Sequence, residues 1–188
     1  MLETALILVV GLTGSGRTTF INEASGSDLK VGGTLKPCTA KVTAAKPFEL
    51  SDRRVILIDT PGLSSDTLTK ISTDVKKLCV SQKQNLAGII YLHRILAKHI
   101  DPTSTLNAQM LKLELNQTPI VIATTFWSKP GQKLSPTPDD IFGEGSNVNA
   151  SVEKYEDSQE SAHKIVSGIM RRSPPAETEI HGSSWCCH

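Results

Sequence analysis

The chain has 188 residues, and its 20 basic and 19 acidic side chains leave a net charge of +1. That balance argues against a protein that binds nucleic acid by bulk electrostatic attraction. With 38% hydrophobic and 21% charged residues, the composition is that of one globular domain. Global disorder, collagen and a small disulfide-stapled fold are excluded.

The cysteines and the apolar runs indicate the compartment. The four cysteines have no disulfide or zinc spacing, since two of them are adjacent at the end of the chain. The longest apolar run, Ala5 to Leu12, is far shorter than the roughly 20 residues that span a bilayer. Glu3 stands where a secretion signal has a positive charge. We expect a soluble, cytoplasmic protein without membrane association.

Buried strands and amphipathic helices alternate along the chain. Continuous apolar runs rich in branched residues predict strands buried on both faces of a parallel sheet, at 5–10, 54–59, 86–92 and 119–124. Apolar residues on even positions predict a half-exposed strand over 41–50. Helical spacing predicts helices over 18–24, from Leu68 to Cys79 with Ser65 or Asp66 as the cap, over 106–113 and over 162–170. We therefore predict an α/β fold, with a mostly parallel sheet sandwiched by helices.

The residue pattern divides the chain into four parts. Residues 1–128 form the expected core domain. The pattern then dissolves, because 128–157 contain three prolines and three glycines and no sustained period. We predict an irregular or disordered insertion over 129–158, a C-terminal helix over 159–172 and a flexible tail over 173–188.

A glycine-rich segment between the first strand and the first helix predicts a phosphate-binding loop. Its glycines allow consecutive backbone N–H groups to curl around phosphate oxygens, and the start of the helix adds partial positive charge. The Thr18 hydroxyl is a ligand for Mg²⁺. The alternative is a glycine-rich turn that binds nothing. The candidate phosphate-binding residues are Gly11, Thr13, Gly14, Ser15, Gly16, Arg17 and Thr18.

An arginine occupies the position before Thr18, where the usual pattern has lysine. Arg17 keeps the positive charge, but its planar fork is larger than an ammonium and directs its donors differently. We expect phosphate binding to survive this change. Arg17 by itself does not supply geometry suited to catalysis.

A second motif, Asp59-Thr60-Pro61-Gly62, closes a buried strand 41 residues after Thr18. The Asp59 carboxylate should emerge at the carboxyl edge of the sheet, beside the phosphate loop, and hold Mg²⁺ through water. The Gly62 N–H can sense a terminal phosphate and couple its presence to the following loop.

These motifs, with residues 31–39 and 87–95, resemble the translation-factor-related GTPases. More closely, residues 4–128 resemble fungal G-domain proteins related to septins and the immune-associated GTPases of plants and vertebrates. The resemblance implies a P-loop G domain, here divergent and incomplete at its C-terminal end, that binds GTP or GDP with Mg²⁺. It also implies that Thr39 completes the Mg²⁺ coordination; the alternative is an ordinary loop threonine.

Guanine selection in the family comes from an Asp after the fifth core strand. In the matching stretch of this chain, Thr125 occupies the Asn/Thr position and Ser128 stands in place of the Asp. Each lost charge-assisted hydrogen bond is worth about 1.5–3 kcal/mol. Preference for guanine should therefore fall by tens to hundreds of fold, and a choice of GTP over ATP rests on the resemblance.

The residue after Gly62 is Leu63, which can neither donate a hydrogen bond to an attacking water nor accept one. Ser64 and Ser65 follow, either as helix caps or as catalytic groups. We predict a Mg²⁺-dependent GTPase-like switch with slow or absent hydrolysis, read by an effector or a second copy and not by nucleic acid. The alternatives are a nucleotide-binding assembly module without turnover and a P-loop ATPase.

One further pair of residues stands at the carboxyl edge of the predicted sheet. His93 and Arg94 follow the strand predicted over 86–92. They either contact nucleotide or a second copy, or are solvated charges of a loop.

Overall fold

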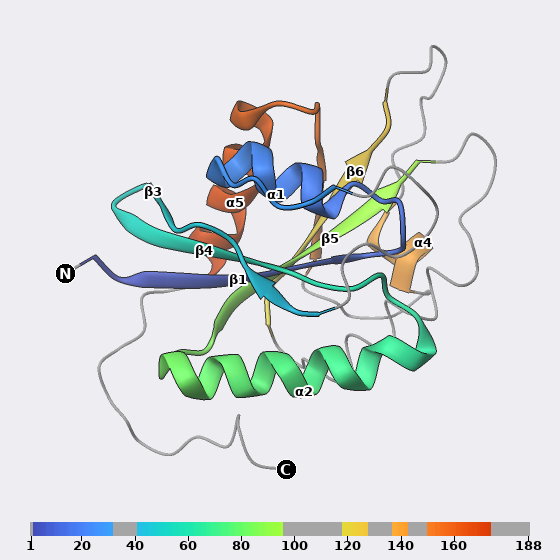
Figure 1. Ribbon diagram of the computed structural model, residues 1–188. Coiled ribbons are helices and arrows are strands. Elements are labelled where there is room, and N and C mark those ends of the chain that lie inside the picture. The colour runs from blue at the N-terminus through green and yellow to red at the C-terminus, as the bar shows by residue number, and fades with distance from the viewer. Residues whose placement is uncertain (1, 32–40, 96–117, 128–136, 143–149, 174–188) are drawn as a thin grey trace.

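The computed structural model describes residues 2–31, 41–95, 118–127, 137–142 and 150–173 (Figure 1). The predictions for a helix over 106–113, for Thr39, for Ser128 and for the tail after residue 173 lie outside these ranges. The elements, in chain order, are β1 (Thr4–Gly11), α1 (Arg17–Ser25), β2 (Thr43–Ala44), β3 (Phe48–Leu50), β4 (Arg53–Asp59), α2 (Ser65–Gln82), β5 (Leu86–Arg94), β6 (Ile120–Thr125), α4 (Pro138–Phe142), β7 (Ala150–Lys154) and α5 (Gln159–Arg172).

The strands form one seven-stranded sheet in the order β2-β4-β1-β5-β6-β7, with β3 also paired to β4. The pairs β1–β4, β1–β5, β5–β6 and β6–β7 are parallel, whereas β2 and β3 run antiparallel to β4. The carboxyl ends of the five parallel strands therefore meet at one edge. The predicted α/β fold with a mostly parallel sheet between helices is confirmed.

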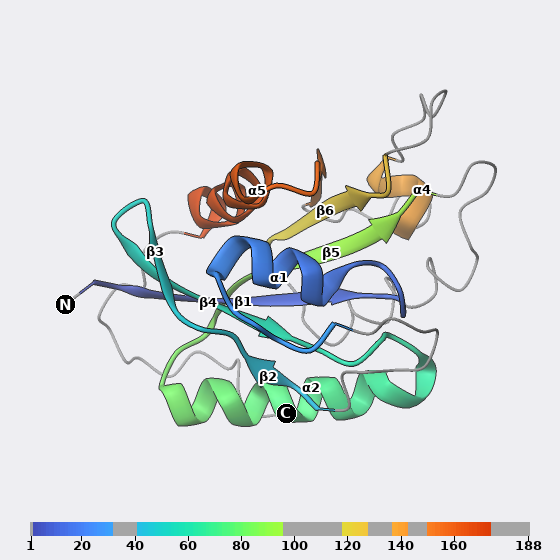
Figure 2. The same ribbon diagram turned by 45° about the horizontal axis from the view of Figure 1, so that its top comes forward.

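Helices cover both faces of the sheet, as Figures 1 and 2 show: α1 and α5 lie on one face and α2 on the other. Side chains of β1 alternate between the two cores, so Ala5 to Val9 on odd positions pack toward α1 and α5, while Leu6 to Val10 on even positions pack toward α2. Both faces of the strand are buried, which explains its continuous apolar run.

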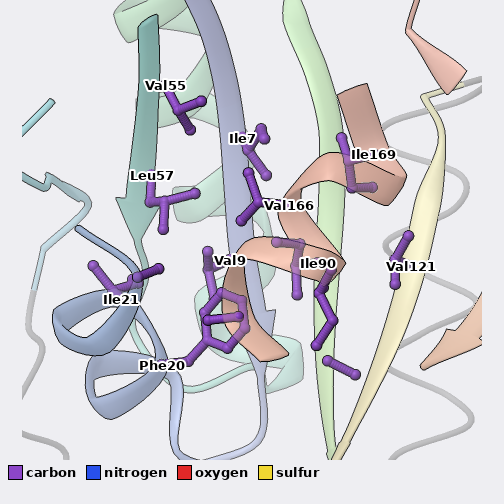
Figure 3. Close-up of a cluster of buried hydrophobic side chains, with 14 of the residues drawn as sticks. Ile7, Val9, Phe20, Ile21, Val55, Leu57, Ile90, Val121, Val166 and Ile169 are labelled. Carbon is purple, nitrogen blue, oxygen red and sulfur yellow. The ribbon is translucent and has the colours of Figure 1, made fainter. Parts of the chain in front are cut away.

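The larger core lies under α1 and α5. Figure 3 shows Phe20 of α1 and Val166 of α5 over Val9 of β1. Phe20 also meets the ring of Tyr155 edge-on, with 5.0 Å between ring centroids. This contact ties α1, and the loop before it, to the segment that follows β7.

The segment 41–50 is not one strand. Its two short strands, β2 and β3, pair with opposite ends of β4 and are separated by residues 45–47. Pro47 has no N–H to give to a ladder, and the Ala45 N–H instead donates to the Leu57 carbonyl at 2.8 Å. The predicted half-burial is confirmed for β3 but wrong for β2, where Thr43 and Ala44 are both exposed, and the predicted element was too long.

The predicted cap of α2 is corrected by one residue. Ser64 is the cap: its hydroxyl accepts the Thr67 N–H at 3.3 Å, and the Thr67 hydroxyl accepts the Ser64 N–H at 2.9 Å. This reciprocal pair satisfies two N–H groups at the helix start. The helix extends to Gln82, beyond the apolar stripe that predicted it.

Residues 150–154 correct the expectation of an irregular segment over 129–158 and of a sheet incomplete at its C-terminal end. They form β7, which pairs with β6 from Ile120↔Ala150 to Thr124↔Lys154. The strand is half-buried at four of its five residues and exposed at the fifth. A strand that is only half-buried does not require a continuous apolar run, so no such run marked β7 in the sequence. The short helix α4 lies in the same segment.

None of the helices in the described ranges combines the length and the hydropathy that crossing a lipid bilayer requires.

Gly88 of β5 lies directly against Ile169 of α5. A Cβ at position 88 would lie 2.9 Å from Ile169 Cδ1 and 3.2 Å from the Pro119 carbonyl oxygen. We expect Gly88→Ala to lower the free energy of unfolding by about 1–3 kcal/mol, because the stiff Ile169 side chain must move. Urea denaturation measures the change.

Gly168 of α5 is the matched control for that substitution. The nearest atom to an added Cβ there is Arg171 Nη2 at 3.8 Å, so the methyl group has room. Gly168→Ala should raise the free energy of unfolding by about 0.5–1 kcal/mol, since alanine favours a helix. Equal effects of the two substitutions would contradict the close packing of α5 on β5.

Candidate phosphate and cation site

The loop between β1 and α1 lies at the carboxyl edge of the sheet, next to the end of β4. Gly14 and Gly16 take left-handed backbone angles, with φ of 80° and 92°. Gly16 is the N-cap of α1, and no side chain caps that helix. The first N–H groups of α1 are therefore not used by a capping side chain, which is the arrangement that binds an anion.

Arg17 connects the loop to the segment after β4. Its Nη1 donates to the Gly11 carbonyl and, at 2.6 Å, to the Leu12 carbonyl, while its Nε donates to the Thr60 carbonyl at 3.2 Å. A guanidinium donates in several directions of one plane, which lets it reach both segments at once. The side chain that replaces the usual lysine thus bonds the two phosphate-site motifs together.

Arg17 is buried, and burial lowers the pKa of its guanidinium from the ordinary value. The negative charge of Asp59 acts in the opposite direction. An arginine stays protonated under both influences because its ordinary pKa is so high. The positive charge is consequently held within the site before any ligand arrives.

Thr18 and Asp59 meet directly. The Thr18 hydroxyl donates to Asp59 Oδ2 at 3.0 Å, and the Thr60 N–H donates to Asp59 Oδ1 at 2.9 Å. Asp59 is 2% exposed. The predicted juxtaposition of these two residues, which are 41 positions apart, is present in the structure.

This pair fits a hard divalent cation. A hydroxyl and a carboxylate are oxygen ligands, and Mg²⁺ is commonly held by one or two carboxylates together with phosphate oxygens and water. The described residues contain no group of three or more His, Cys, Asp or Glu that would hold a metal by protein alone. A cation here would therefore need oxygens from a bound phosphate as well.

Gly62 packs against the phosphate loop. An added Cβ at position 62 would overlap Thr13 Oγ1 and lie 3.1 Å from the Thr13 nitrogen, so the close approach requires glycine. The next N–H, that of Leu63, donates to the Gly11 carbonyl at 3.0 Å. The start of the segment after β4 is thus attached to the loop at two further points.

The Leu63 side chain is 4% exposed and packs in the core under α2. The Leu63 side chain is therefore shielded from solvent, and it has no group that forms hydrogen bonds. The Ser64 hydroxyl caps α2. Of the two roles considered for Ser64, helix cap or catalytic group, the structure therefore supports the cap.

Thr125 lies at the end of β6 and is 2% exposed. Its hydroxyl is within 3.2 Å of the Ser15 carbonyl oxygen and 3.4 Å of the His93 carbonyl oxygen. It therefore positions the phosphate loop against β5 and β6. Contact of Thr125 and Ser128 with a base stays a prediction. The role of Thr39 as a metal ligand stays a prediction as well.

The sequence did not reveal two cation and ring pairs near β6. The Arg94 guanidinium lies 4.6 Å from the ring centroid of Phe126, and Lys154 Nζ lies 5.3 Å from that of Trp127. Each pair joins a ring just after β6 to a cation on a neighbouring strand, so no local signal marks it. His93, by contrast, is buried and stacks near Tyr91, which corrects its default reading as a solvated loop charge.

A family model described as "50S ribosome-binding GTPase" matches residues 6–125. No curated protein sequence matches the chain.

Three solved structures illustrate the likeness. One, of the chloroplast translocon components atToc33 and psToc159, superposes with a TM-score of 0.68 at 13% identity over 96% of this chain and 87% of that one. Era with MgGDPNP and part of 16S ribosomal RNA gives 0.63 at 15% identity, over 96% and 60%. Toc33 from Arabidopsis thaliana with GDP and Mg²⁺ gives 0.50 at 14%, over 94% and 65%. At such identities the likeness shows the fold alone.

Arg17→Met should lower the free energy of unfolding of the nucleotide-free protein by about 1–3 kcal/mol. The buried carbonyls of Gly11 and Thr60 lose a donor, and buried Asp59 loses the positive charge beside it. Arg17→Lys is the control: it keeps the charge but cannot span both segments, so we expect a smaller loss. Urea denaturation of a Met variant as stable as the original chain would contradict the bridge.

His93 should make the protein less stable below about pH 6.5. Burial lowers the pKa of His93, so the unfolded chain binds its proton at a higher pH than the folded chain. The free energy of unfolding then falls as the pH drops below about 6.5, by at most about 1.4 kcal/mol per unit. His93→Gln should flatten this slope in denaturation curves between about pH 5.5 and 7.5. An unchanged slope would contradict the assignment.

Proposed function

We propose that this chain, which belongs to the 50S ribosome-binding GTPase family, is a Mg²⁺-dependent guanine-nucleotide switch with slow or absent hydrolysis. The observation that carries the proposal is the direct contact of Thr18 with Asp59 at 3.0 Å, beside a charged Arg17 that joins both motifs. A cation and a phosphate chain require these groups in one place.

The phosphates lie against the loop from Gly11 to Thr18. The N–H groups at the start of α1 and the guanidinium of Arg17 supply positive charge there. Within the described residues, the guanidinium donates three hydrogen bonds, all to backbone carbonyls. An arginine has five N–H donors, so it retains capacity for a phosphate oxygen.

Thr18 and Asp59 would hold Mg²⁺, and Thr39 would complete its protein ligands. When bound, the cation neutralises charge on the β- and γ-phosphates. The Thr18 hydroxyl and the Asp59 carboxylate, 3.0 Å apart, are the oxygens that would face the cation or its water. Gly62, attached to the loop next to Thr13, reports the terminal phosphate through its N–H.

Slow hydrolysis follows from what surrounds the terminal phosphate. Leu63 is buried in the core under α2, and Ser64 is committed to capping that helix. Neither orients an attacking water. Leu63 and Ser64 therefore supply no group for the reaction, and turnover would depend on an activating partner; the side chain of Ser65 lies outside the described structure.

A nucleotide-binding assembly module without turnover is the second candidate, and the burial of Leu63 favours it. In either case the reader of the bound state is an effector or a second copy. Dimerization is described as important for the GTPase activity of atToc33 and psToc159. The Era structure includes ribosomal RNA, whereas a net charge of +1 offers this chain little bulk attraction for RNA.

The finer placement among fungal septin-related and immune-associated GTPases, and a cytoplasmic location, are part of the same proposal. They rest on the sequence motifs and on the cysteine pattern. A G-domain core over residues 1–128 is proposed from the family match over residues 6–125, while β7 and α5 add to the same sheet and core.

The proposal is tested by calorimetric titration of the full chain with GTP, with and without Mg²⁺, together with an assay of phosphate release. We expect saturable binding that weakens at least about ten-fold when Mg²⁺ is withdrawn or in Asp59→Ala and Thr18→Ala. Release of phosphate should be no faster than about 10⁻³ s⁻¹.

Thr73→Ala is the matched control, because Thr73 is exposed on α2 and bonds only within that helix. Its binding should equal that of the original chain. Absence of saturable binding, or binding indifferent to Asp59, would refute the proposed function. Binding without any release would favour the assembly module over the switch.

A further inference from the structure

Helix α5 presents a polar outer face to solvent. The helix packs its apolar side on β5, β6 and α1, and Figure 2 shows it on the outside of the molecule. The opposite side is a line of polar residues spaced three or four positions apart, which brings them onto one face of the helix. These residues are Glu160, Lys164, Ser167 and Arg171, of which Ser167 is half-buried and the others are exposed.

The charges on this face are separated along the helix. The acidic end has Asp157 just before the helix and Glu160 in the first turn, and the basic end has Arg171 and Arg172 in the last turn. All four residues are exposed, and none of them forms an ion pair with another described residue. Glu160 and Arg171 are about 16 Å apart along the helix axis, so they cannot pair within one chain. Both ends therefore have charge that is open to a partner.

The middle of the face carries little net charge. Lys164 has its Nζ 3.5 Å from Glu153 Oε2 of β7, which offsets its positive charge. Ser167 and Gly168 add little bulk, and the nearest atom to a Cβ added at Gly168 is Arg171 Nη2, at 3.8 Å. A second helix can therefore approach the middle of α5 without a clash and without meeting an unpaired cation.

We propose that this outer face of α5 binds the same face of a second copy of the chain, with the two helices antiparallel. A two-fold axis beside positions 165 and 166 then places Glu160 of each copy opposite Arg171 of the other. Asp157 and Arg172 of the two copies come together at the same two ends. The contact is isologous, so each pair of opposite charges occurs twice. A parallel arrangement would instead set like charges against each other, which is repulsive.

The inference goes beyond the proposed function, since pairing through α5 uses no residue of the phosphate loop or of the Asp59 motif. A contact between two helices of 14 residues is smaller than a standard interface, which buries roughly 800 Å² per partner. Ion pairs at an exposed surface are individually weak and are screened by salt. We therefore expect a reversible dimer that forms at high protein concentration and low ionic strength.

Sedimentation velocity of the full chain without nucleotide tests the inference, from about 10 μM to about 1 mM protein in about 50 mM and about 500 mM salt. At low salt the average mass should rise from 20.3 kDa toward twice that value as the concentration increases. At high salt the Kd of the dimer should be at least about ten-fold higher, because salt screens exposed charges.

Two charge reversals, Glu160→Arg and Arg171→Glu, test the pairing itself. Each variant alone should have a Kd at least about ten-fold higher than the original chain, because the two-fold axis creates two like-charge contacts. An equal mixture of the two variants should associate as the original chain does, since every pair is then opposite in sign. Lys77→Glu is the matched control: it reverses an exposed charge on α2 and should leave the Kd unchanged. Circular dichroism checks that each variant is folded.

A chain that stays monomeric at low salt and at the highest concentration would overturn the inference. A dimer whose Kd neither reversal changes would also overturn it, because another surface would then hold the two copies together. The same is true of a mixture of the two variants that remains monomeric. The proposed function stands or falls separately, since GTP titration depends on Thr18, Asp59 and the loop.

Discussion

The guanidinium of Arg17 is the interaction on which the site depends. It donates to carbonyls of the loop after β1 and to the Thr60 carbonyl after β4. Around it, Thr18 meets Asp59, and Gly62 packs against Thr13. A single ammonium could not make both sets of contacts. The planar fork of Arg17 thus adds a further connection between two motifs that also meet through Thr18 and Asp59 and through Gly62 and Thr13.

The sheet makes this contact possible. β1 and β4 are parallel neighbours from Thr4↔Arg54 to Val9↔Asp59, so the loop after one strand and the turn after the other emerge side by side. Helices α1 and α2 pack on opposite faces and hold the two segments from both sides. Apolar packing over the whole sheet thereby sets the distance between Thr18 and Asp59 at its carboxyl edge.

The same packing restricts the chemistry. The core that anchors the segment before α2 includes Leu63, and the helix start uses Ser64 as its cap. Leu63 and Ser64 are thus committed to structure, whereas Gly62 itself remains next to the loop. Neither of these two side chains is available to orient an attacking water, which is why we predict slow hydrolysis.

The sequence by itself determined the phosphate loop, the Asp59 motif and the four central strands, because each depends on local spacing or on a continuous apolar run. It did not reveal β7, a half-buried strand with no apolar run, or the division of 41–50 into two strands. Only the tertiary structure decided that Arg17 bridges two loops and that Arg94 backs Phe126. Those contacts join residues up to 43 positions apart, and their partners are set by strand order and register, which no local pattern encodes.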